Sequence, residues 1–331
     1  MKNRTDIKLG VAFSGGGVRG LAHLGVLQVL EEAEIPIDAV AGTSMGGIVA
    51  GLYAAEVPVQ EIIAFGQETG FMDLASPDRG LRGLFGHTKI AALLADLLGT
   101  KDLAFEDLNT PAAVVSADVE TGELIILDKG PLIPALMATS AVPLVFSPVR
   151  HQGRWLVDGC VLNNLPVDVV RRMGADRVLG VNVPPNVNLS LGDGEEEKEL
   201  PLWELFRLDN HIRDWKLPFL VAEASAAFTV RIVNQTRLTL CPPDLLLEIH
   251  LPNVGIFPND DSADIIRAGR WIATDHLKEL VKLKTNPLPP RWWRRLKSTW
   301  FRVRSAWTWL QESEYPLYPG ESSLVSVASR A

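Results

Sequence analysis

Short apolar runs and longer mixed stretches alternate along the first 183 residues of this 331-residue chain. The short runs are bounded by glycines and polar residues, which is typical of buried strands, and the stretches between them have the length of helices. Such alternation favours an α/β layered fold with a largely parallel central sheet. Strands are predicted at Leu9–Phe13, Ile37–Ala41, Ala112–Ala117, Leu124–Leu127, Trp155–Val157 and Arg177–Val183, and helices at Leu21–Leu30 and Ile48–Ala55.

Two longer segments nearer the C-terminus, Pro218–Leu240 and Ser262–Lys284, predict helices. The second has N-capping residues at its start, Asp260, Asp261 and Ser262. Val149–Val157 contains His151-Gln152-Gly153 between two short runs and predicts a hairpin.

The uncharged stretch Ala39–Ala55 has the composition of a membrane span. However, Gly-Thr-Ser and Gly-Gly interrupt it, and it falls short of the roughly 20 residues that cross a bilayer. A strand, a turn and a buried helix account for it better, so we expect no transmembrane segment. The polar stretch Met1–Lys8 does not have the pattern of a signal peptide.

The composition, 47% hydrophobic residues, supports a sizeable buried core. The chain has two cysteines, Cys160 and Cys241, in unrelated contexts, and neither a disulfide framework nor a metal-binding spacing follows from them. This cysteine usage suits a reducing compartment. We therefore expect a cytoplasmic protein without a metal or other cofactor.

A Gly-x-Ser-x-Gly run, Gly42-Thr43-Ser44-Met45-Gly46, lies between a predicted strand and a predicted helix. In that context it predicts a nucleophile elbow, a sharp turn that lifts the serine clear of its neighbours at a helix N-terminus. Side chains at positions 42 and 46 would collide as the strand and the helix fold back on each other. The alternative is a Gly/Ser loop that only joins strand to helix.

A second glycine-rich turn, Ser14-Gly15-Gly16-Gly17-Val18-Arg19-Gly20, follows the first predicted strand and precedes the first predicted helix. Backbone N–H groups at a helix N-terminus bind anions. The anion could be a phosphate or the oxyanion of a tetrahedral acyl intermediate.

Gly15, Gly17 and Gly20 also satisfy the dinucleotide fingerprint Gly-x-Gly-x-x-Gly. That fingerprint expects an acidic residue near the end of the second strand, to bind the ribose. The second strand here ends in Ala41–Ser44, and Asp38 lies at its start. We therefore favour the oxyanion function, and a nucleotide-binding oxidoreductase stays as a less favoured alternative.

The third segment is Trp155-Leu156-Val157-Asp158-Gly159, in which Asp158 ends a predicted strand. Taken alone, Asp-Gly is a common turn signal and needs no further explanation.

Together the three segments resemble the patatin-like phospholipase family, in its compact bacterial branch. Its pattern is a Gly-Gly-Gly-x-Arg-Gly loop, a Gly-x-Ser-x-Gly elbow and an Asp-Gly-Gly/Ala turn. The similarity includes Ala138–Phe146 and Asn163–Val170, and extends from about Lys8 to about Lys284. Cys160 stands where the family usually has Gly or Ala, but its side chain is small, so we expect the turn to survive. The resemblance implies a three-layer α/β/α fold with a mostly parallel central sheet.

The resemblance also implies a serine esterase or lipid acyl hydrolase, of the phospholipase A or lysophospholipase type, with a Ser-Asp dyad. Ser44 would attack the ester carbonyl, and Asp158 would accept its proton and later activate water. The oxyanion hole would lie in the loop that begins at Gly15, with the N–H groups of Gly16 and Gly17 as donors and Val18 as a further donor. Arg19 either contacts a lipid phosphate or orders the loop, and we favour the second role.

A Ser-His-Asp triad is the nearby alternative, and it requires a histidine after Asp158. His250 lies in an apolar run that predicts a strand, and His276 lies in a predicted amphipathic helix. His23 lies inside the first predicted helix and is expected to support the glycine-rich loop. We therefore favour the dyad.

The composition changes after Pro287-Leu288-Pro289-Pro290. Arg291–Leu310 carries six basic residues and no acidic one, so its formal charge is +6, while the whole chain carries −8 and the remainder therefore −14. Its tryptophans and leucines recur at helical spacing, which is typical of a helix lying in a lipid interface. Docking of this helix on the acidic body is the alternative, and the acidic remainder argues against nucleic-acid binding.

We therefore expect a hydrolase domain over residues 8–286 and a basic, tryptophan-rich segment with a tail over residues 287–331. The expected substrate is a phospholipid or another lipid ester, cleaved at a membrane surface that the Arg291–Leu310 segment contacts. A non-catalytic lipid-binding or scaffold protein of the same fold is the alternative. The sequence does not indicate an oligomeric state.

Overall fold

The protein is described by a computed structural model over residues 7–68, 76–77, 85–185, 216–251, 254 and 262–287. The chain divides into two units, Met1–Leu288 and Pro289–Ala331, and the described residues all belong to the first. The predicted interfacial helix Arg291–Leu310 lies outside the described residues.

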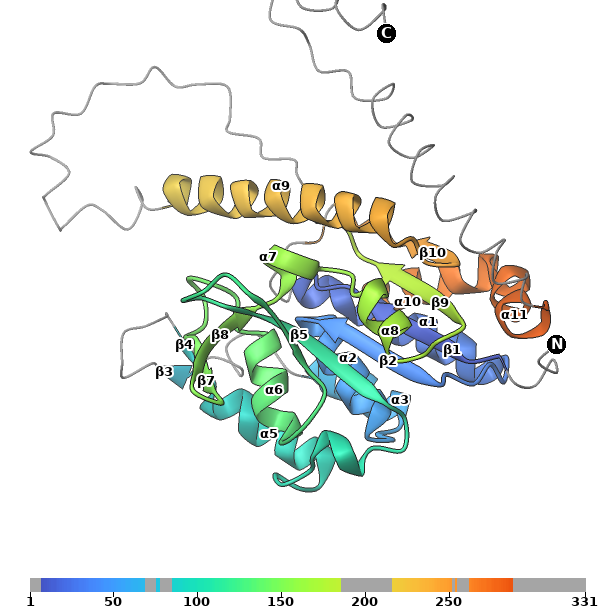
Figure 1. Ribbon diagram of the computed structural model, residues 1–331, viewed down its shortest axis with the longest axis horizontal. Helices are drawn as coiled ribbons and strands as arrows, with labels where there is room; N and C mark the ends of the chain where they lie inside the picture. Colours follow the sequence, from blue (N-terminus) through green and yellow to red (C-terminus); the bar gives the residue numbers. More distant parts are fainter. Residues whose placement is uncertain are drawn as a thin grey trace, which may run out of the picture. The chain divides into compact units, whose positions relative to one another are not determined.

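An eight-stranded sheet forms the centre of the first unit, in the order β10-β9-β1-β2-β5-β8-β7, with β6 also paired to β5 (Figure 1). The strands from β10 to β5 are parallel, and β6, β7 and β8 pair in antiparallel fashion. The strands of this sheet are β1 Leu9–Phe13, β2 Ala39–Thr43, β5 Ala112–Asp118, β6 Leu124–Leu127, β7 Val149–His151, β8 Arg154–Asp158, β9 Arg177–Asn182 and β10 Leu245–Glu248. A separate two-stranded ribbon joins β3 Ser76–Pro77 to β4 Phe85–Gly86.

Helices follow most of the strands along the chain. They are η1 Gly17–Leu21, α1 Ala22–Glu32, α2 Met45–Ala54, α3 Val59–Glu68, α5 Thr88–Leu98, η2 Phe105–Asp107, α6 Leu132–Thr139, α7 Cys160–Asn163, α8 Val167–Arg172, α9 Lys216–Leu240, α10 Ser262–Asp275 and α11 Leu277–Thr285.

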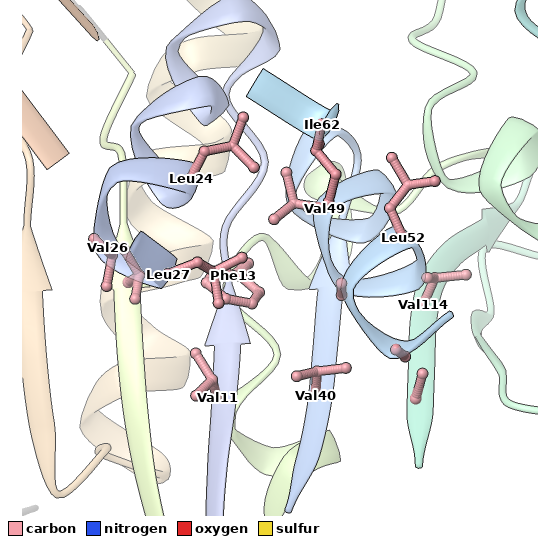
Figure 2. Close-up of a cluster of buried hydrophobic side chains, with 14 of the residues drawn as sticks. Val11, Phe13, Leu24, Val26, Leu27, Val40, Val49, Leu52, Ile62 and Val114 are labelled. Carbon is pink, nitrogen blue, oxygen red and sulfur yellow. The ribbon is translucent and has the colours of Figure 1, made fainter. Parts of the chain in front are cut away.

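The larger core lies on one face of the sheet. Val11 and Phe13 of β1, Val40 of β2 and Val114 of β5 point to this face, where they meet buried leucines and valines of α1 and α2 (Figure 2). Side chains from α3, α5, α6, α10 and α11 extend the same core. Alternate residues of a strand point to opposite faces, so the regular spacing of these positions follows from the pleat.

The opposite face is built from small residues and is covered by α8 and the C-terminal part of α9. Ala12, Ala41 and Ala113 pack there against valines of α8 and Leu238 of α9. The fold is therefore a three-layer α/β/α arrangement around a mostly parallel sheet, as the sequence predicts.

Strands β2 and β8 pair with the same edge of β5 and approach each other end to end. The opposite edge of β5 is occupied by β6, which pairs with Val114–Ala117. On their shared edge β2 runs parallel to β5 as far as Thr43, opposite Val115, and β8 runs antiparallel as far as Asp158, opposite Ser116. The carboxyl ends of β2 and β8 therefore meet at neighbouring positions of β5.

One predicted helix is divided in the structure. Ser262–Lys284 was expected to be continuous, but α10 ends at Asp275 and α11 begins at Leu277. The ring of His276 is hydrogen-bonded through Nδ1 to the Ile272 carbonyl, 2.9 Å away, which the His276 backbone N–H also contacts at 3.2 Å. A side chain that competes for the carbonyl four residues before it weakens the helical ladder at that point.

Within the described part of the chain, every helix is either too short or too polar to cross a bilayer.

Candidate active site

Ser44 occupies a strained turn between β2 and α2. Its backbone has φ 56° and ψ −130°, an unusual combination for a residue with a side chain. Such strain persists only when the surroundings fix it. Here the Ser44 N–H donates a hydrogen bond of 3.0 Å to the Thr139 hydroxyl, which in turn donates to the Val115 carbonyl. The predicted elbow is therefore present.

Close packing of backbone around the elbow requires glycine at two positions. A Cβ at Gly42 would lie 2.1 Å from the Gly46 carbonyl oxygen, and a Cβ at Gly46 would lie 2.4 Å from the Ser14 carbonyl oxygen. These contacts are with backbone, which cannot swing aside. The predicted collision at positions 42 and 46 is confirmed.

The glycine-rich loop approaches the elbow from the end of β1. Gly17 has φ 59°, a left-handed conformation that favours glycine, and it begins the short helix η1. The first N–H groups of a helix lack partners within it. Among the described residues, no hydrogen bond is recorded from the N–H groups of Gly16, Gly17 or Val18 to a group outside that helix. The loop thus presents free donors, while the Val18 side chain is buried in the core.

Arg19 is 4% exposed and bonds to the loop itself. Its Nε donates to the Gly16 carbonyl at 3.1 Å, and one terminal nitrogen donates to the Pro184 carbonyl at 3.3 Å. These contacts tie the loop to the segment after β9, which fits an ordering role.

His23 and Ser14 support the loop from inside. The His23 Nε2 lies 2.8 Å from the Ser14 carbonyl oxygen, and burial lowers the pKa of His23 to about 4. His23 is therefore neutral at pH 7, and its Nε2–H is the donor of this bond. The structural role expected for His23 is confirmed.

Asp158 ends β8 in a fully buried position. Its Oδ1 accepts the Cys160 N–H at 2.8 Å. A Cβ at Gly159 would lie 2.4 Å from the Val115 carbonyl oxygen, so the Asp-Gly turn needs its glycine. Cys160, where the family usually has Gly or Ala, is the first residue of α7, and the turn is formed as expected. Burial raises the pKa of Asp158 to about 6, against the lowering effect of the Ser44 hydroxyl and the Cys160 N–H.

Ser44 and Asp158 line the same pocket, and the Ser44 hydroxyl lowers the pKa of the Asp158 carboxyl. Nevertheless, the buried Oδ2 of Asp158 has no hydrogen-bond partner of normal geometry among the described residues. Such bonds are often long in proteins without substrate and shorten when substrate binds.

A pocket of about 250 Å³ contains both residues. Gly15, Gly16, Gly17 and Arg19 also line it, so the structure brings together every predicted site residue except Val18. The remaining walls are mainly apolar and come from four segments: Val142–Val145, Cys160 with Val161 and Asn164, Val183 with Pro185, and Ala226, Ala227 and Val230 of α9.

The histidines considered for a triad lie elsewhere. No histidine is found among the described residues that line this pocket. His276 caps α11, and His250 follows β10 and lines a separate cavity. The predicted strand position of His250 is wrong, because β10 ends at Glu248.

Two residues that help to build the site lie in segments that resemble the family, but the sequence predicts no role for them. Thr139 holds the Ser44 N–H from a position 95 residues away, and Asn164 accepts the Gly15 N–H through its carbonyl at 3.1 Å. The Asn164 amide also donates to the Gly15 carbonyl at 3.4 Å. Nothing local distinguishes these residues from other buried polar ones.

The described residues contain no group of three or more His, Cys, Asp or Glu side chains arranged to hold a metal ion.

Comparison with known proteins gives a consistent picture. A family model for patatin-like phospholipase matches residues 11–171, which include Ser44 and Asp158. An uncharacterized NTE family protein of Mycobacterium tuberculosis is 32% identical over 186 residues, 55% of this chain and 51% of that protein. The lysophospholipase nte1 of Emericella nidulans is 24% identical over 304 residues, 85% of this chain and 19% of that protein. The chain thus spans about half the length of the mycobacterial relative and less of the fungal one.

Among solved structures, VipD from Legionella pneumophila is similar with a TM-score of 0.55 and 13% sequence identity, over 93% of this chain and 75% of that chain. At this identity the similarity concerns the fold alone.

Proposed function

We propose that this chain, which belongs through residues 11–171 to the patatin-like phospholipase family, is a serine hydrolase that cleaves acyl esters of lipids. The proposal assigns Ser44 as nucleophile, Asp158 as general base, and the N–H groups of Gly16 and Gly17 as the oxyanion hole. The proposed hydrolase would be of the phospholipase A or lysophospholipase type.

In the first half of the proposed reaction, the Ser44 Oγ forms a bond to the ester carbonyl carbon, and its proton passes to the Asp158 Oδ2. A serine hydroxyl needs such a base because it is a weak nucleophile by itself. The carbonyl oxygen gains negative charge, which the free N–H groups of the glycine-rich loop stabilise. The ester C–O bond then breaks, the alcohol leaves with the proton from Asp158, and an acyl-enzyme remains.

In the second half, Asp158 accepts a proton from water as the water oxygen attacks the acyl carbon. The tetrahedral intermediate collapses, the bond to Ser44 breaks, and the Ser44 oxygen takes the proton back. The products are a fatty acid and the regenerated enzyme.

One observation carries the proposal. The buried Asp158 carboxylate has one oxygen without a hydrogen-bond partner, and it shares an apolar pocket with the serine of a strained elbow. A buried carboxylate oxygen without a partner is costly for stability, and groups that are retained at such a cost cluster at functional sites. The apolar walls fit an acyl chain. A scaffold that only bound lipid would need neither the buried carboxylate nor the strained serine. A dinucleotide-binding enzyme would need a ribose-binding carboxylate, which is lacking at the described end of β2.

The test is labelling with a serine-directed alkyl phosphonate, followed by mass spectrometry of the intact protein and its peptides. We expect one adduct, on Ser44, and parallel loss of fatty-acid release from phospholipid vesicles. Ser44→Ala should show neither labelling nor release, whereas Ser225→Ala, which alters an exposed serine on α9, should match the wild type. Labelling on another serine, or release by Ser44→Ala, would contradict the proposal.

The proposed membrane contact through Arg291–Leu310 can be tested separately, since that segment lies outside the described residues. A chain ending at Asn286 should sediment less with anionic vesicles than the full chain, because each basic residue near such a surface contributes roughly 1 kcal/mol. Equal sedimentation of the two chains would exclude the segment as a membrane contact.

A further inference from the structure

A second cavity, of about 340 Å³, opens beside the catalytic pocket. It lies where β9 and β10 end, just as the catalytic pocket lies where β1 and β2 end. The two are neighbours, because Pro185 lines both, and Arg19 joins the adjacent Pro184 carbonyl to the glycine-rich loop. In parallel sheets ligands bind in the crevice outside the carboxyl ends of the strands, so both cavities are at positions suited to one extended ligand.

Helix α9 forms a wall of both cavities and changes character between them. Ala226, Ala227 and Val230 line the catalytic pocket. From the next residue on, the α9 residues that line the second cavity are mostly polar: Arg231, Asn234 and Gln235, followed by Leu238. The same helix thus offers an apolar surface beside Ser44 and a polar surface farther along. This order matches a lipid ester, whose acyl chain is apolar and whose headgroup is polar.

A chain of hydrogen bonds fixes how the polar cavity is oriented. The Glu248 carboxylate can only accept, so the Asn182 nitrogen that donates to it at 2.9 Å is assigned without ambiguity. The Asn182 oxygen therefore faces Asn234, whose nitrogen donates to it at 3.3 Å. This leaves the Asn234 oxygen buried and without a hydrogen-bond partner among the described residues.

An unpartnered acceptor at a residue only 5% exposed is unfavourable unless a ligand or a water molecule supplies a donor. Asn234 lines the cavity, so a donor group bound there lies next to its side chain. The missing partner is an N–H or O–H group.

Arg231 and His250 supply the complementary chemistry. Both line the cavity, and neither makes a recorded hydrogen bond or ion pair with the described residues. A guanidinium presents several donors in a plane and suits a phosphate. Glu248, across the cavity, adds a negative charge for a cationic group. The cavity therefore combines a phosphate-binding cation with acceptors for a donor-bearing cation.

We propose that this cavity is the headgroup subsite for a phospholipid whose headgroup carries its own hydrogen-bond donors, as ethanolamine does. Arg231 binds the phosphodiester, and the Asn234 oxygen together with Glu248 binds the ammonium group. A trimethylammonium group has no N–H, so choline leaves the Asn234 oxygen unpartnered. This inference rests on the proposed function, since it places the scissile ester at Ser44.

The test compares three esters with the same acyl chain in the same detergent micelles: phosphatidylethanolamine, phosphatidylcholine and a headgroup-free p-nitrophenyl ester. We expect the wild type to have a kcat/KM for phosphatidylethanolamine roughly tenfold above that for phosphatidylcholine. Asn234→Leu should bring this ratio close to one, and Asn234→Asp, which keeps an acceptor oxygen, should retain the preference. A wild type that prefers phosphatidylcholine, or a ratio unchanged in Asn234→Leu, overturns the subsite.

Arg231 is tested by a different ratio, because both phospholipids carry the phosphate. Arg231→Gln should lower the turnover of both phospholipids relative to the p-nitrophenyl ester, roughly tenfold, and Arg231→Lys should restore part of the difference. The matched control is Arg267→Gln, at an exposed arginine of α10 that pairs with Asp264 of the same helix, and it should leave all ratios unchanged. A phospholipid-to-p-nitrophenyl ratio in Arg231→Gln equal to that of the wild type overturns the phosphate contact.

Failure of the proposed function gives a different result. If the wild type cleaves none of the three esters, the hydrolase proposal is wrong, and the subsite is then judged by calorimetry with glycerophosphoethanolamine and glycerophosphocholine on the full chain. Tighter binding of glycerophosphoethanolamine, lost in Asn234→Leu, supports the subsite by itself. Equal binding of the two, or none, overturns it.

Discussion

The two cavities at the carboxyl edge of the sheet differ in how they treat charge. The pocket at β1 and β2 holds a single buried carboxylate, Asp158, among apolar walls, and burial raises its pKa to about 6. The cavity at β9 and β10 is lined by Arg231, Glu248 and His250, all exposed to solvent. Isolation from water makes a carboxylate a better base, whereas a cluster of solvent-exposed charged and polar side chains suits recognition. Under the two proposals, chemistry and headgroup binding are separated along one edge of the sheet.

The largest expected effect comes from removing the charge from the apolar pocket. Asp158→Asn should lower kcat for a p-nitrophenyl ester by roughly 10⁴-fold, because the proton of Ser44 then has no acceptor. Steady-state kinetics measures this loss of kcat. The control is Asp275→Asn, at an exposed aspartate of α10. Activity within tenfold of the wild type would mean that the buried carboxylate is not the base.

The next effect concerns the backbone that shapes each cavity. Gly42→Ala should destabilise the protein by more than about 3 kcal/mol, since the new Cβ meets backbone at 2.1 Å. Gly180→Ala, in β9 two residues before Asn182 of the polar cavity, should cost much less, because its Cβ meets only side-chain atoms at 3.2–3.3 Å. Urea unfolding of both variants measures the two losses in the free energy of unfolding. Equal losses would show that the apolar pocket is no more tightly constrained than its neighbour.

A smaller effect follows from the raised pKa of Asp158. In the unfolded chain this carboxyl releases its proton near its ordinary value of 3.8, whereas the folded protein retains it until about pH 6. Between these values the unfolded state binds fewer protons, so stability decreases as pH rises. The full loss above pH 6 is roughly 2–3 kcal/mol.

Asp158→Asn lacks this titration and should be more stable than the wild type by that amount at pH 7.5, with the difference vanishing near pH 3.5. Urea unfolding at the two pH values measures it. In the same range kcat/KM of the wild type should fall tenfold per pH unit below about pH 6, since the base must be ionised. A pH-independent stability difference would exclude burial as the cause.

The smallest effect is expected at a histidine outside both cavities. His276→Ala should leave kcat/KM within about twofold of the wild type, because His276 only interrupts the α10–α11 helix. A loss of a hundredfold or more, with unchanged circular dichroism, would replace the dyad by a Ser-His-Asp triad.

Much of the fold is predictable because its elements have local signals. The apolar run Leu9–Phe13 is β1, and Leu124–Leu127 is β6, at the predicted bounds. By contrast, the predicted bounds around the elbow are shifted: β2 covers Ala39–Thr43 and α2 begins at Met45, so Ser44 alone separates the strand from the helix. The break at His276 was not predictable, since it depends on where one side chain hydrogen-bonds rather than on hydrophobic periodicity.

The motifs of the site were also predictable, because glycines at fixed spacing mark the positions where backbone must approach backbone. The residues that hold these motifs in place through hydrogen bonds were not predictable. Thr139, Asn164 and Asn234 are polar residues on ordinary apolar helices or turns, and only long-range contacts reveal what they hold. The apolar wall of α9 was likewise hidden, since Ala226, Ala227 and Val230 look like core residues in the sequence.

The shared edge of β5 also has a consequence for biosynthesis. Ser44 is made early, but its partner Asp158 reaches it only after β8 has been synthesised and has paired beside β2 on β5. Pairings this distant along the chain form late in folding because their loop-closure entropy is high. A nascent or truncated chain therefore carries the elbow without the carboxylate. Under the proposed function, such a chain would lack its general base until β8 has paired with β5.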